Sequence, residues 1–296
     1  MQNLRELFLS STSKFSESNF LLSREKNYTY SDFFYLTNQF SNYLLNNDIR
    51  QNDIVAIISE KSIFQYISLF AIWNIGAVAV PINENLNSIE LDFIISDCCP
   101  KKIIVSDKFY EKLEYKNKIR INILGNEDTS IPYVESIDKE NLACIVYTSG
   151  STGNPKGVML THKNFIYNAD SVVRAVPFFK NDIIYSILPY WHSFGLSTEA
   201  ISPVLSGSQI AFTDNALTFA KDLTFFNPSV VLIVPRVAEM FKSNILKKFK
   251  SLGEDTYNKF NFALNESLKI THITPEIDDL EKFNGLKTSA FNNIKA

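Results

Sequence analysis

Short apolar runs along the chain alternate with stretches in which apolar residues recur at the spacing of a helix. The apolar runs predict strands over Asp53–Ile58, Ala77–Ile82, Lys102–Val105, Ile119–Leu124, Leu142–Tyr147, Val158–Leu160, Ile183–Leu188, Gln209–Phe212 and Val230–Val234. The intervening stretches predict helices over Ser62–Ile75, Ser88–Asp97 and Lys163–Val176, the last one capped by Thr161. Because the strands are apolar on both faces and alternate with helices, the pattern is typical of an α/β fold with mostly parallel β-sheets flanked by helices.

The last sixty residues have a different pattern. Lys242–Lys269 is polar and rich in lysine with a helical period, Thr271–Asn284 is acidic and loop-like, and a helical pattern resumes at Leu286. We expect residues 241–285 to form a largely helical segment of their own. For its lysine-rich part, an ordinary solvated helix pair is favoured over peripheral contact with a membrane.

Composition argues against several classes of protein. A net charge of −3 gives no reason to expect a nucleic-acid partner, and no apolar run approaches the roughly 20 residues that span a bilayer. The N-terminus has no signal-peptide core. The three cysteines, Cys98, Cys99 and Cys144, have no metal-ligand spacing, which indicates a reduced, cytoplasmic compartment.

The glycines are concentrated in one place. Only 9 of the 296 residues are glycine, yet three of them fall within the run YTSGSTGNPKG from Tyr147 to Gly157. Glycine lets a backbone approach an anion closely and point successive N–H groups at it. Further donors come from Thr148, Ser149, Ser151, Thr152 and Lys156. Since an apolar strand leads into the run, we predict a phosphate-binding loop, with a solvated hairpin turn as the weaker alternative.

This loop is not that of the P-loop NTPases, because Lys156 is followed by glycine. The longer run IVYTSGSTGNPKGVMLTHKN resembles the signature of the AMP-forming acyl-CoA synthetases, the adenylating superfamily that includes luciferases and the adenylation domains of peptide synthetases. Thr29–Leu86 resembles the N-terminal stretch of that family in order and spacing, so the resemblance covers nearly the whole chain.

The resemblance implies a fold, a reaction and a set of site residues. The fold is that of the N-terminal acyl-adenylating domain, and the reaction is ATP-dependent: a substrate carboxylate attacks the α-phosphorus, pyrophosphate leaves, and coenzyme A takes the acyl group from the acyl-adenylate. Lys156 is implied as the catalytic residue that offsets charge on the leaving pyrophosphate. The implied ATP phosphate-binding residues are Thr148, Ser149, Gly150, Ser151, Thr152, Gly153, Lys156 and Gly157.

Two further segments bear on the acid that is activated. Leu188–Gly195, LPYWHSFG, resembles the family element L-P-x-x-H-x-x-G, which implies that His192 lines or gates the acyl pocket; a core or surface-loop histidine is the alternative. The aromatic neighbours of His192 are pocket-lining candidates, although core packing is commoner. Asn227–Phe241 resembles a segment of the long-chain fatty acyl members, so a long-chain fatty acid is the first choice. A ligase for an acyl-carrier protein or another adenylating enzyme is the alternative.

Other motifs of the family do not occur in this sequence. They are an aromatic-Gly-x-Thr-Glu segment for adenine and magnesium, an aspartate for the ribose, and a small C-terminal domain with a catalytic lysine. Gly195–Glu199 is one residue too long for the first of them, so we assign Glu199 to a helix.

We therefore expect residues 1–296 to be a partial N-terminal AMP-binding domain, with the small C-terminal domain absent and the Mg²⁺ ligands elsewhere. We also expect poor solubility and no complete acyl-CoA synthesis from this chain alone. A non-catalytic remnant or interaction module is the alternative from another class of protein.

Overall fold

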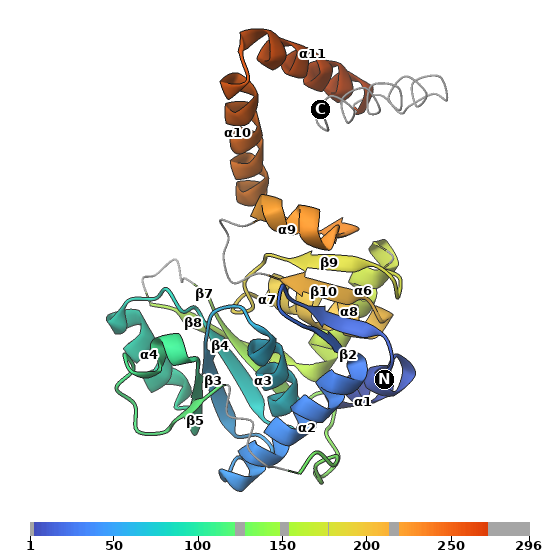
Figure 1. Ribbon diagram of the computed structural model, residues 1–296. Helices are drawn as coiled ribbons and strands as arrows, with labels where there is room; N and C mark the ends of the chain where they lie inside the picture. Colours follow the sequence, from blue (N-terminus) through green and yellow to red (C-terminus); the bar gives the residue numbers. More distant parts are fainter. Residues whose placement is uncertain (1–2, 122–127, 149–153, 177, 213–218, 272–296) are drawn as a thin grey trace. The chain divides into compact units, whose positions relative to one another are not determined.

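The computed structural model describes residues 3–121, 128–148, 154–176, 178–212 and 219–271, which belong to two compact units, Met1–Leu232 and Ile233–Ala296 (Figure 1). Within the described residues of the larger unit, one sheet has six strands in the order β6-β5-β3-β4-β7-β8. Their bounds are β3 Ile54–Ile58, β4 Val78–Ile82, β5 Lys102–Val105, β6 Lys118–Arg120, β7 Leu142–Thr148 and β8 Lys156–Thr161. All neighbours in this sheet are parallel except β7 and β8, which are antiparallel.

The second sheet has, in the described part of the chain, five strands in the order β11-β9-β10-β1-β2. Their bounds are β1 Asn19–Leu22, β2 Asn27–Thr29, β9 Ile183–Ser186, β10 Gln209–Phe212 and β11 Val230–Val231. Strand β1 is parallel to β10, with Leu21 opposite Ile210, and only β2 runs antiparallel to its neighbour among these strands. The predicted fold class, mostly parallel sheets flanked by helices, is confirmed.

Helices cover both faces of the six-stranded sheet. Its helices are α3 (Ile63–Asn74), α4 (Ser88–Cys98) and α5 (Asp107–Tyr110). Side chains alternate along each strand, so Val55 and Ile57 of β3 face α3, whereas Ala56 and Ile58 belong to the core under α4. Helix α3 is apolar on nearly every side because it lies between the two sheets (Figure 1).

The core between the sheets is rich in aromatic rings. The remaining elements of this unit are α1 (Leu4–Lys14), α2 (Tyr30–Asn46), α6 (His162–Ala175), α7 (Ser193–Gly195), the π-helix η1 (Leu196–Ile201), α8 (Ser202–Ser206) and α9 (Phe219–Phe226). Phe33 of α2 packs edge-on against Phe8 of α1 and Phe70 of α3, and Trp73 donates a hydrogen bond from Nε1 to the carbonyl of Ala143 on β7. These contacts fix the helices to the first sheet.

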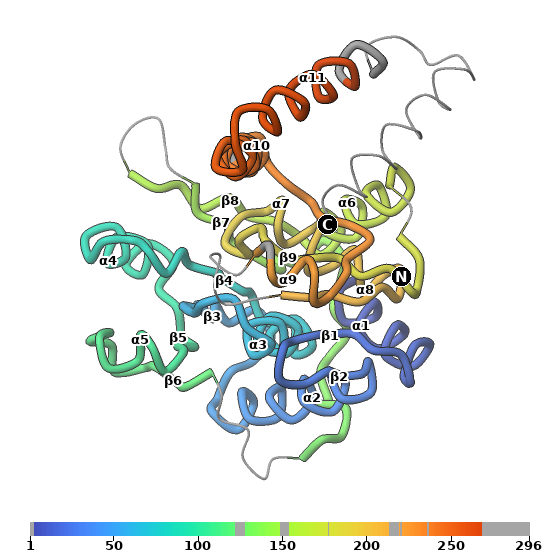
Figure 2. Tube along the Cα trace, turned by 45° about the horizontal axis from the view of Figure 1, so that its top comes forward, coloured from blue at the N-terminus to red at the C-terminus, as the bar shows by residue number. Residues whose placement is uncertain are grey.

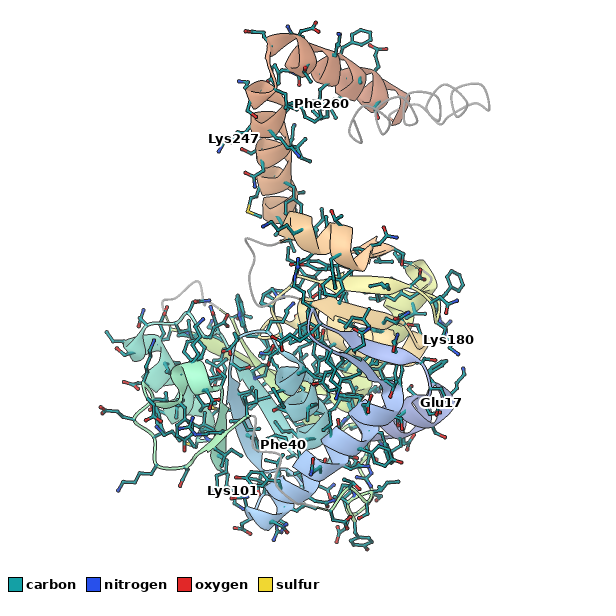
Figure 3. All side chains as sticks on the ribbon, in the orientation of Figure 1. Glu17, Phe40, Lys101, Lys180, Lys247 and Phe260 are labelled. Atoms are coloured by element: carbon teal, nitrogen blue, oxygen red, sulfur yellow. The ribbon has the colours of Figure 1, made fainter. Side chains whose placement is uncertain are left out.

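The smaller unit is described over residues 233–271 and contains α10 (Pro235–Ser251) and α11 (Glu254–Thr271). The two helices meet through Phe249 and Phe260, whose stacked ring centroids lie 4.0 Å apart. Phe260 is labelled in Figure 3. The helical period predicted for Lys242–Lys269 is confirmed; contact with a membrane stays a prediction. Among the described residues, no helix has the length and apolar character needed to cross a bilayer.

Three differences from the predicted elements have physical causes. Strands β1 and β2 were not predicted, because β1 is short and the residues after it, SREKNYT, are polar. Strand β9 ends at Ser186 rather than Leu188, because the N–H groups of Ile187 and Leu188 donate to the carboxylate of Glu199 instead of a neighbouring strand. Strand β6 covers Lys118–Arg120, and residues 122–124 of the predicted strand lie outside the described residues.

Candidate functional site

The predicted phosphate loop connects the two strands of the β7–β8 hairpin (Figure 1 and Figure 2). Thr148 at the end of β7 lies directly opposite Lys156 at the start of β8, and both side chains are exposed. A hydroxyl and an ammonium group therefore stand side by side where the loop leaves the sheet. A hairpin turn and a phosphate-binding loop are the two alternatives for this run, and the β7–β8 hairpin is compatible with both. Ser149, Gly150, Ser151, Thr152 and Gly153 lie outside the described residues.

Gly157 has a packing reason of its own. A Cβ atom at this position would lie 2.9 Å from Cγ2 of Ile145 and 3.2 Å from Cζ of Tyr147. The Tyr147 hydroxyl donates to Oδ2 of Asp97 at 2.5 Å, and burial together with this carboxylate raises the pKa of Tyr147. The absence of a side chain at Gly157 lets the ring of Tyr147 lie close to β8 while its hydroxyl connects the hairpin to α4.

His192 lies on the surface, at the N-cap of α7. Its Nδ1 accepts a hydrogen bond from the N–H of Phe194 at 3.2 Å, which orients the ring and leaves Nε2 for other contacts. The core alternative for this histidine is wrong, because the side chain is exposed. Its aromatic neighbours differ: Tyr190 is buried in the core, whereas Phe194 is 43% exposed.

Sequence reasoning missed a buried cluster next to this histidine. Glu199 is confirmed as helical, in η1, but its side chain is fully buried and its Oε2 lies 3.2 Å from Nζ of Lys61. Burial lowers the pKa of the Lys61 ammonium, while Glu199 and Glu84 partly oppose that shift. The available signal was a lone carboxylate in an otherwise uncharged segment, LSTEAIS, since such a group needs a partner when it is buried.

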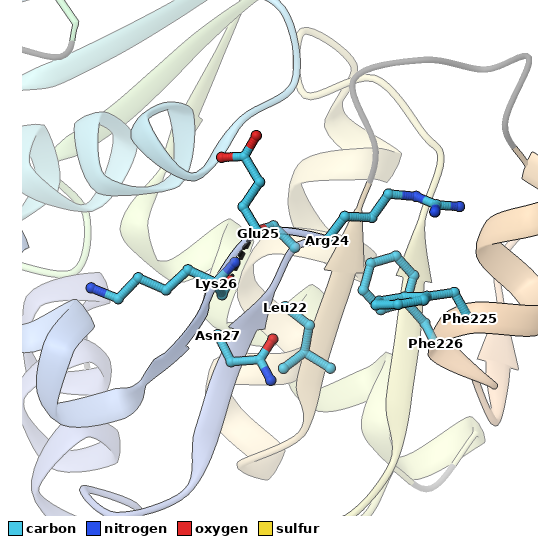
Figure 4. A pocket seen from close by; sticks show the side chains of 8 residues that line it. Leu22, Arg24, Glu25, Lys26, Asn27, Phe225 and Phe226 are labelled. Atoms are coloured by element: carbon cyan, nitrogen blue, oxygen red, sulfur yellow. Dashed lines mark hydrogen bonds between the residues drawn. The ribbon is translucent and has the colours of Figure 1, made fainter.

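A separate pocket lies on the second sheet. It has a volume of about 310 Å³ and is lined by the β1–β2 turn, residues 22–27, together with Phe225 and Phe226 (Figure 4). Arg24 extends over the ring of Phe225 and pairs with the buried carboxylate of Asp222 at 2.5 Å. Of the predicted site residues that the structure describes, none lines this pocket.

Metal binding can be judged only for the residues that the structure describes. Among them, no group of three or more His, Cys, Asp or Glu side chains could hold a metal ion. The Mg²⁺ ligands therefore stay unassigned.

Comparison with known proteins identifies a family. A model described as AMP-binding enzyme matches residues 9–276. Long chain acyl-CoA synthetase 8 of Arabidopsis thaliana is 27% identical over 282 residues, covering 81% of this chain and 39% of that protein. Bacitracin synthase 2 of Bacillus licheniformis is 25% identical over 211 residues, covering 70% of this chain and 8% of that protein. The long-chain-fatty-acid–[acyl-carrier-protein] ligase AEE15 of Arabidopsis thaliana is 32% identical over 144 residues, covering 48% and 19%.

A solved structure shares the fold. The Klebsiella oxytoca NpsA N-terminal subdomain, in complex with 3-hydroxybenzoyl-AMSN, has a TM-score of 0.76 at 20% identity, covering 83% of this chain and 63% of that one. The chain spans less than two fifths of each of the three sequence relatives named above.

Proposed function

Because the chain belongs to the AMP-binding enzyme family, we propose that it is part of an ATP-dependent, AMP-forming ligase that converts a long-chain fatty acid through an acyl-adenylate to acyl-CoA. The observation that carries the proposal is the β7–β8 hairpin, which presents Thr148 and Lys156 side by side at the predicted phosphate loop. The choice of a fatty acid is supported by the segment Asn227–Phe241 and by the likeness to a long chain acyl-CoA synthetase.

The residues of the hairpin suit the proposed first step. An oxygen of the substrate carboxylate forms a bond to the α-phosphorus of ATP, the bond from that phosphorus to the bridging oxygen breaks, and pyrophosphate carries away the electron pair. The protein has little covalent chemistry to do, so positioning and neutralisation of charge dominate. The ammonium of Lys156 offsets charge on the β- and γ-phosphates, and the hydroxyl of Thr148 donates a hydrogen bond to them.

Coenzyme A completes the proposed reaction as the acyl acceptor: its thiolate attacks the acyl carbon and AMP leaves. Mg²⁺ would add positive charge at the phosphates, but the described residues provide no ligand set for it, so no step here depends on it. We propose that His192 lines or gates the acyl end of the site.

Two alternatives keep the same site. A carrier-protein thiol can replace coenzyme A as acceptor, or another carboxylic acid can replace the fatty acid; similarity to an acyl-carrier-protein ligase and to a peptide synthase keeps both open. A non-catalytic remnant is the third alternative. Binding measurements on the purified chain separate these possibilities.

We propose a cytoplasmic location for the enzyme. The cysteines are all free, with Cys98 and Cys144 buried and Cys99 exposed, which supports a reducing compartment. Cell fractionation tests this, and recovery in the membrane fraction would instead favour peripheral contact through the lysines of α10.

The first experiment is calorimetric titration of the chain with acyl-sulfamoyl adenosines that carry palmitoyl, 3-hydroxybenzoyl or aminoacyl groups. The complex of the NpsA N-terminal subdomain with 3-hydroxybenzoyl-AMSN supports the use of such compounds on an N-terminal region alone. We expect the palmitoyl compound to bind at least about tenfold more tightly than the other two, a difference of roughly 1.4 kcal/mol. Tighter binding of an aryl or aminoacyl compound contradicts the fatty-acid assignment, and no binding of any compound favours the remnant.

The second experiment tests Lys156. Lys156→Ala should weaken ATP binding about tenfold and leave AMP binding unchanged, because one charge-assisted contact to the outer phosphates is lost. The melting temperature should not move, since Lys156 is exposed at the loop. Lys180→Ala, which removes an exposed lysine on the second-sheet side, is the control (Figure 3). Equal loss of ATP and AMP affinity would contradict the assigned role.

A further inference from the structure

A buried ion pair connects the two sheets of the larger unit. Lys61 follows β3 of the first sheet, and Glu199 lies in η1, beside β9 of the second. Their side chains are 13% and 0% exposed, and Nζ of Lys61 lies 3.2 Å from Oε2 of Glu199. A buried pair of this kind gives little net stability compared with apolar residues of the same size. The pair is therefore better explained by the residues that it holds in position than by the stability that it adds.

The carboxylate of Glu199 holds the end of β9. Its Oε2 accepts a hydrogen bond from Oγ of Ser186 at 2.6 Å and from the N–H of Leu188 at 2.9 Å, while Oε1 accepts from the N–H of Ile187 at 3.1 Å. The N–H groups of Ile187 and Leu188 would otherwise bond to a neighbouring strand and continue β9. One side chain thus ends β9 and sets the direction of the residues that follow.

The ammonium of Lys61 holds the same residues from the first sheet. It donates to the carbonyl of Leu188 at 2.5 Å and to Oγ of Ser186 at 2.9 Å, and it lies 4.5 Å from the centre of the Tyr190 ring. The hydroxyl of Tyr190 lies 2.9 Å from Oγ of Ser186. Both charges of the pair are therefore satisfied by a single segment, residues 186–190.

Gly195 closes the segment on its other side. A Cβ atom at Gly195 would lie 2.2 Å from the carbonyl oxygen of Pro189, so the residue that precedes the π-helix packs directly on the turn. Single turns of π-helix occur frequently at functional sites, and here η1 carries Glu199 back to the end of β9. Two residues after the buried Tyr190, the side chain of His192 is exposed. Its ring is oriented by the N–H of Phe194.

We propose that Lys61 and Glu199 are positioning residues for His192: together they fix the turn of residues 187–191 and thereby place the imidazole. The substrate relevance of that placement rests on the proposed function, in which His192 contacts the acyl chain. The placement of the imidazole does not rest on the proposed function, because it is argued from hydrogen bonds within this chain alone.

The first readout needs no ligand. In the full chain labelled with ¹⁵N-histidine, Glu199→Gln should shift and broaden the ring resonances of His192, since one charge partner is lost and the turn gains freedom. The ring of His162, buried at the start of α6 against α1, should keep its resonances and serves as the internal reference. Unchanged His192 resonances in the folded variant would overturn the proposal.

Two more variants cover the case in which Glu199→Gln fails to fold. Ser186→Ala keeps both charges but removes the hydroxyl between them, and it should move the His192 resonances in the same direction by a smaller amount. Lys101→Met breaks the more exposed pair between Lys101 and Asp53 at 2.9 Å and should leave them unmoved (Figure 3). A response to Lys101→Met as large as that to Ser186→Ala would contradict the specific role.

The second readout links the placement to the reaction. In folded Glu199→Gln and Ser186→Ala we expect affinity for palmitoyl-sulfamoyl adenosine to fall about tenfold and affinity for ATP to change less than twofold, because none of the contacts given above for Lys61 and Glu199 involves Thr148 or Lys156. Equal loss of both affinities would overturn the positioning role in favour of general damage. If the wild-type chain binds no acyl-sulfamoyl adenosine, the proposed function fails, and the resonances of His192 still decide the placement.

Discussion

At the scale of single residues, His162 connects the buried start of α6 to α1. It is fully buried in the first turn of α6, where Nδ1 accepts the N–H of Leu4 at 3.3 Å, and Nε2 has no hydrogen-bond partner among the described residues. Burial lowers the pKa of His162 to about 4. The neutral imidazole therefore holds α1 against α6.

This arrangement predicts a pH dependence of stability. The pKa of His162 in the folded chain lies below its ordinary value of 6.5, so the unfolded chain takes up a proton first as the pH falls. The contribution of His162 to the free energy of unfolding should be fully present above pH 6.5. The free energy of unfolding should then fall by up to about 3 kcal/mol on going to pH 4. The free energy of unfolding, measured with urea at several pH values across this range, should change less steeply with pH in His162→Gln than in wild type. The exposed His192→Gln is the control, and identical slopes for all three chains would refute the assignment.

Residues that lie close together along the chain could be grouped from the sequence. Lys156, Thr148 and Gly157 could be grouped because they flank one short loop, and the structure brings them onto one hairpin. Glu199 could not be paired with Lys61, because 138 residues separate them and nothing in the local pattern of either one identifies the other. Which polar residues are buried together is a property of the packing of the two sheets.

At the scale of elements, the strands that the sequence predicted well are those buried on both faces. Strand β3 and strand β4 have apolar residues at every position, and their predicted bounds match to within one residue. Strand β1 has only four residues and gains its stability from β10, which lies far along the chain. Local composition carries little of that information.

Helices α10 and α11 show how much a single contact can matter in a small unit. Gly253 joins them with a φ of +109°, a conformation that suits glycine, and Phe249 stacks on Phe260. Several other large apolar side chains in this segment remain exposed, among them Met240, Ile245, Leu252 and Phe262.

We expect Phe260→Ala to loosen this helix pair. An aromatic contact of this kind is worth about 0.5–1.5 kcal/mol beyond the area it buries, so amide exchange along α10 and α11 should accelerate by roughly twofold to tenfold. Phe262→Ala is the matched control, because its ring is 67% exposed. Equal acceleration in both variants would show that the stacked rings do not hold the pair.

At the scale of the whole molecule, the α/β class followed from the alternation of patterns, but the assignment of strands to sheets did not. Strands β8 and β9 follow each other along the chain, yet they belong to different sheets. The chain passes between the sheets after α6, and no local signal marks that passage.

One edge of the first sheet also has a consequence for solubility. Within the described residues β8 has β7 as its strand neighbour, and it exposes Val158 and Met159 to 44% and 67%. Exposed apolar edge strands promote association between chains. Met159→Lys should therefore lower light scattering from concentrated solutions severalfold, by about two- to fivefold. Ile89→Lys changes an equally apolar, 80% exposed side chain on α4; a matching drop there would attribute the effect to charge alone.

The pairing of β1 with β10 affects the order in which the protein can be assembled on the ribosome. Leu21 meets Ile210 only after nearly 190 further residues have been translated, which takes on the order of ten seconds or more at roughly 5–20 residues per second. During that interval β1 can pair with β2 but not with β10, and Phe20 and Leu21, both buried in the finished protein, lack the rest of their sheet. The newly emerged N-terminus is therefore the part of this protein on which nascent-chain chaperones would act, and arrested chains that stop before β10 should be cut there by proteases.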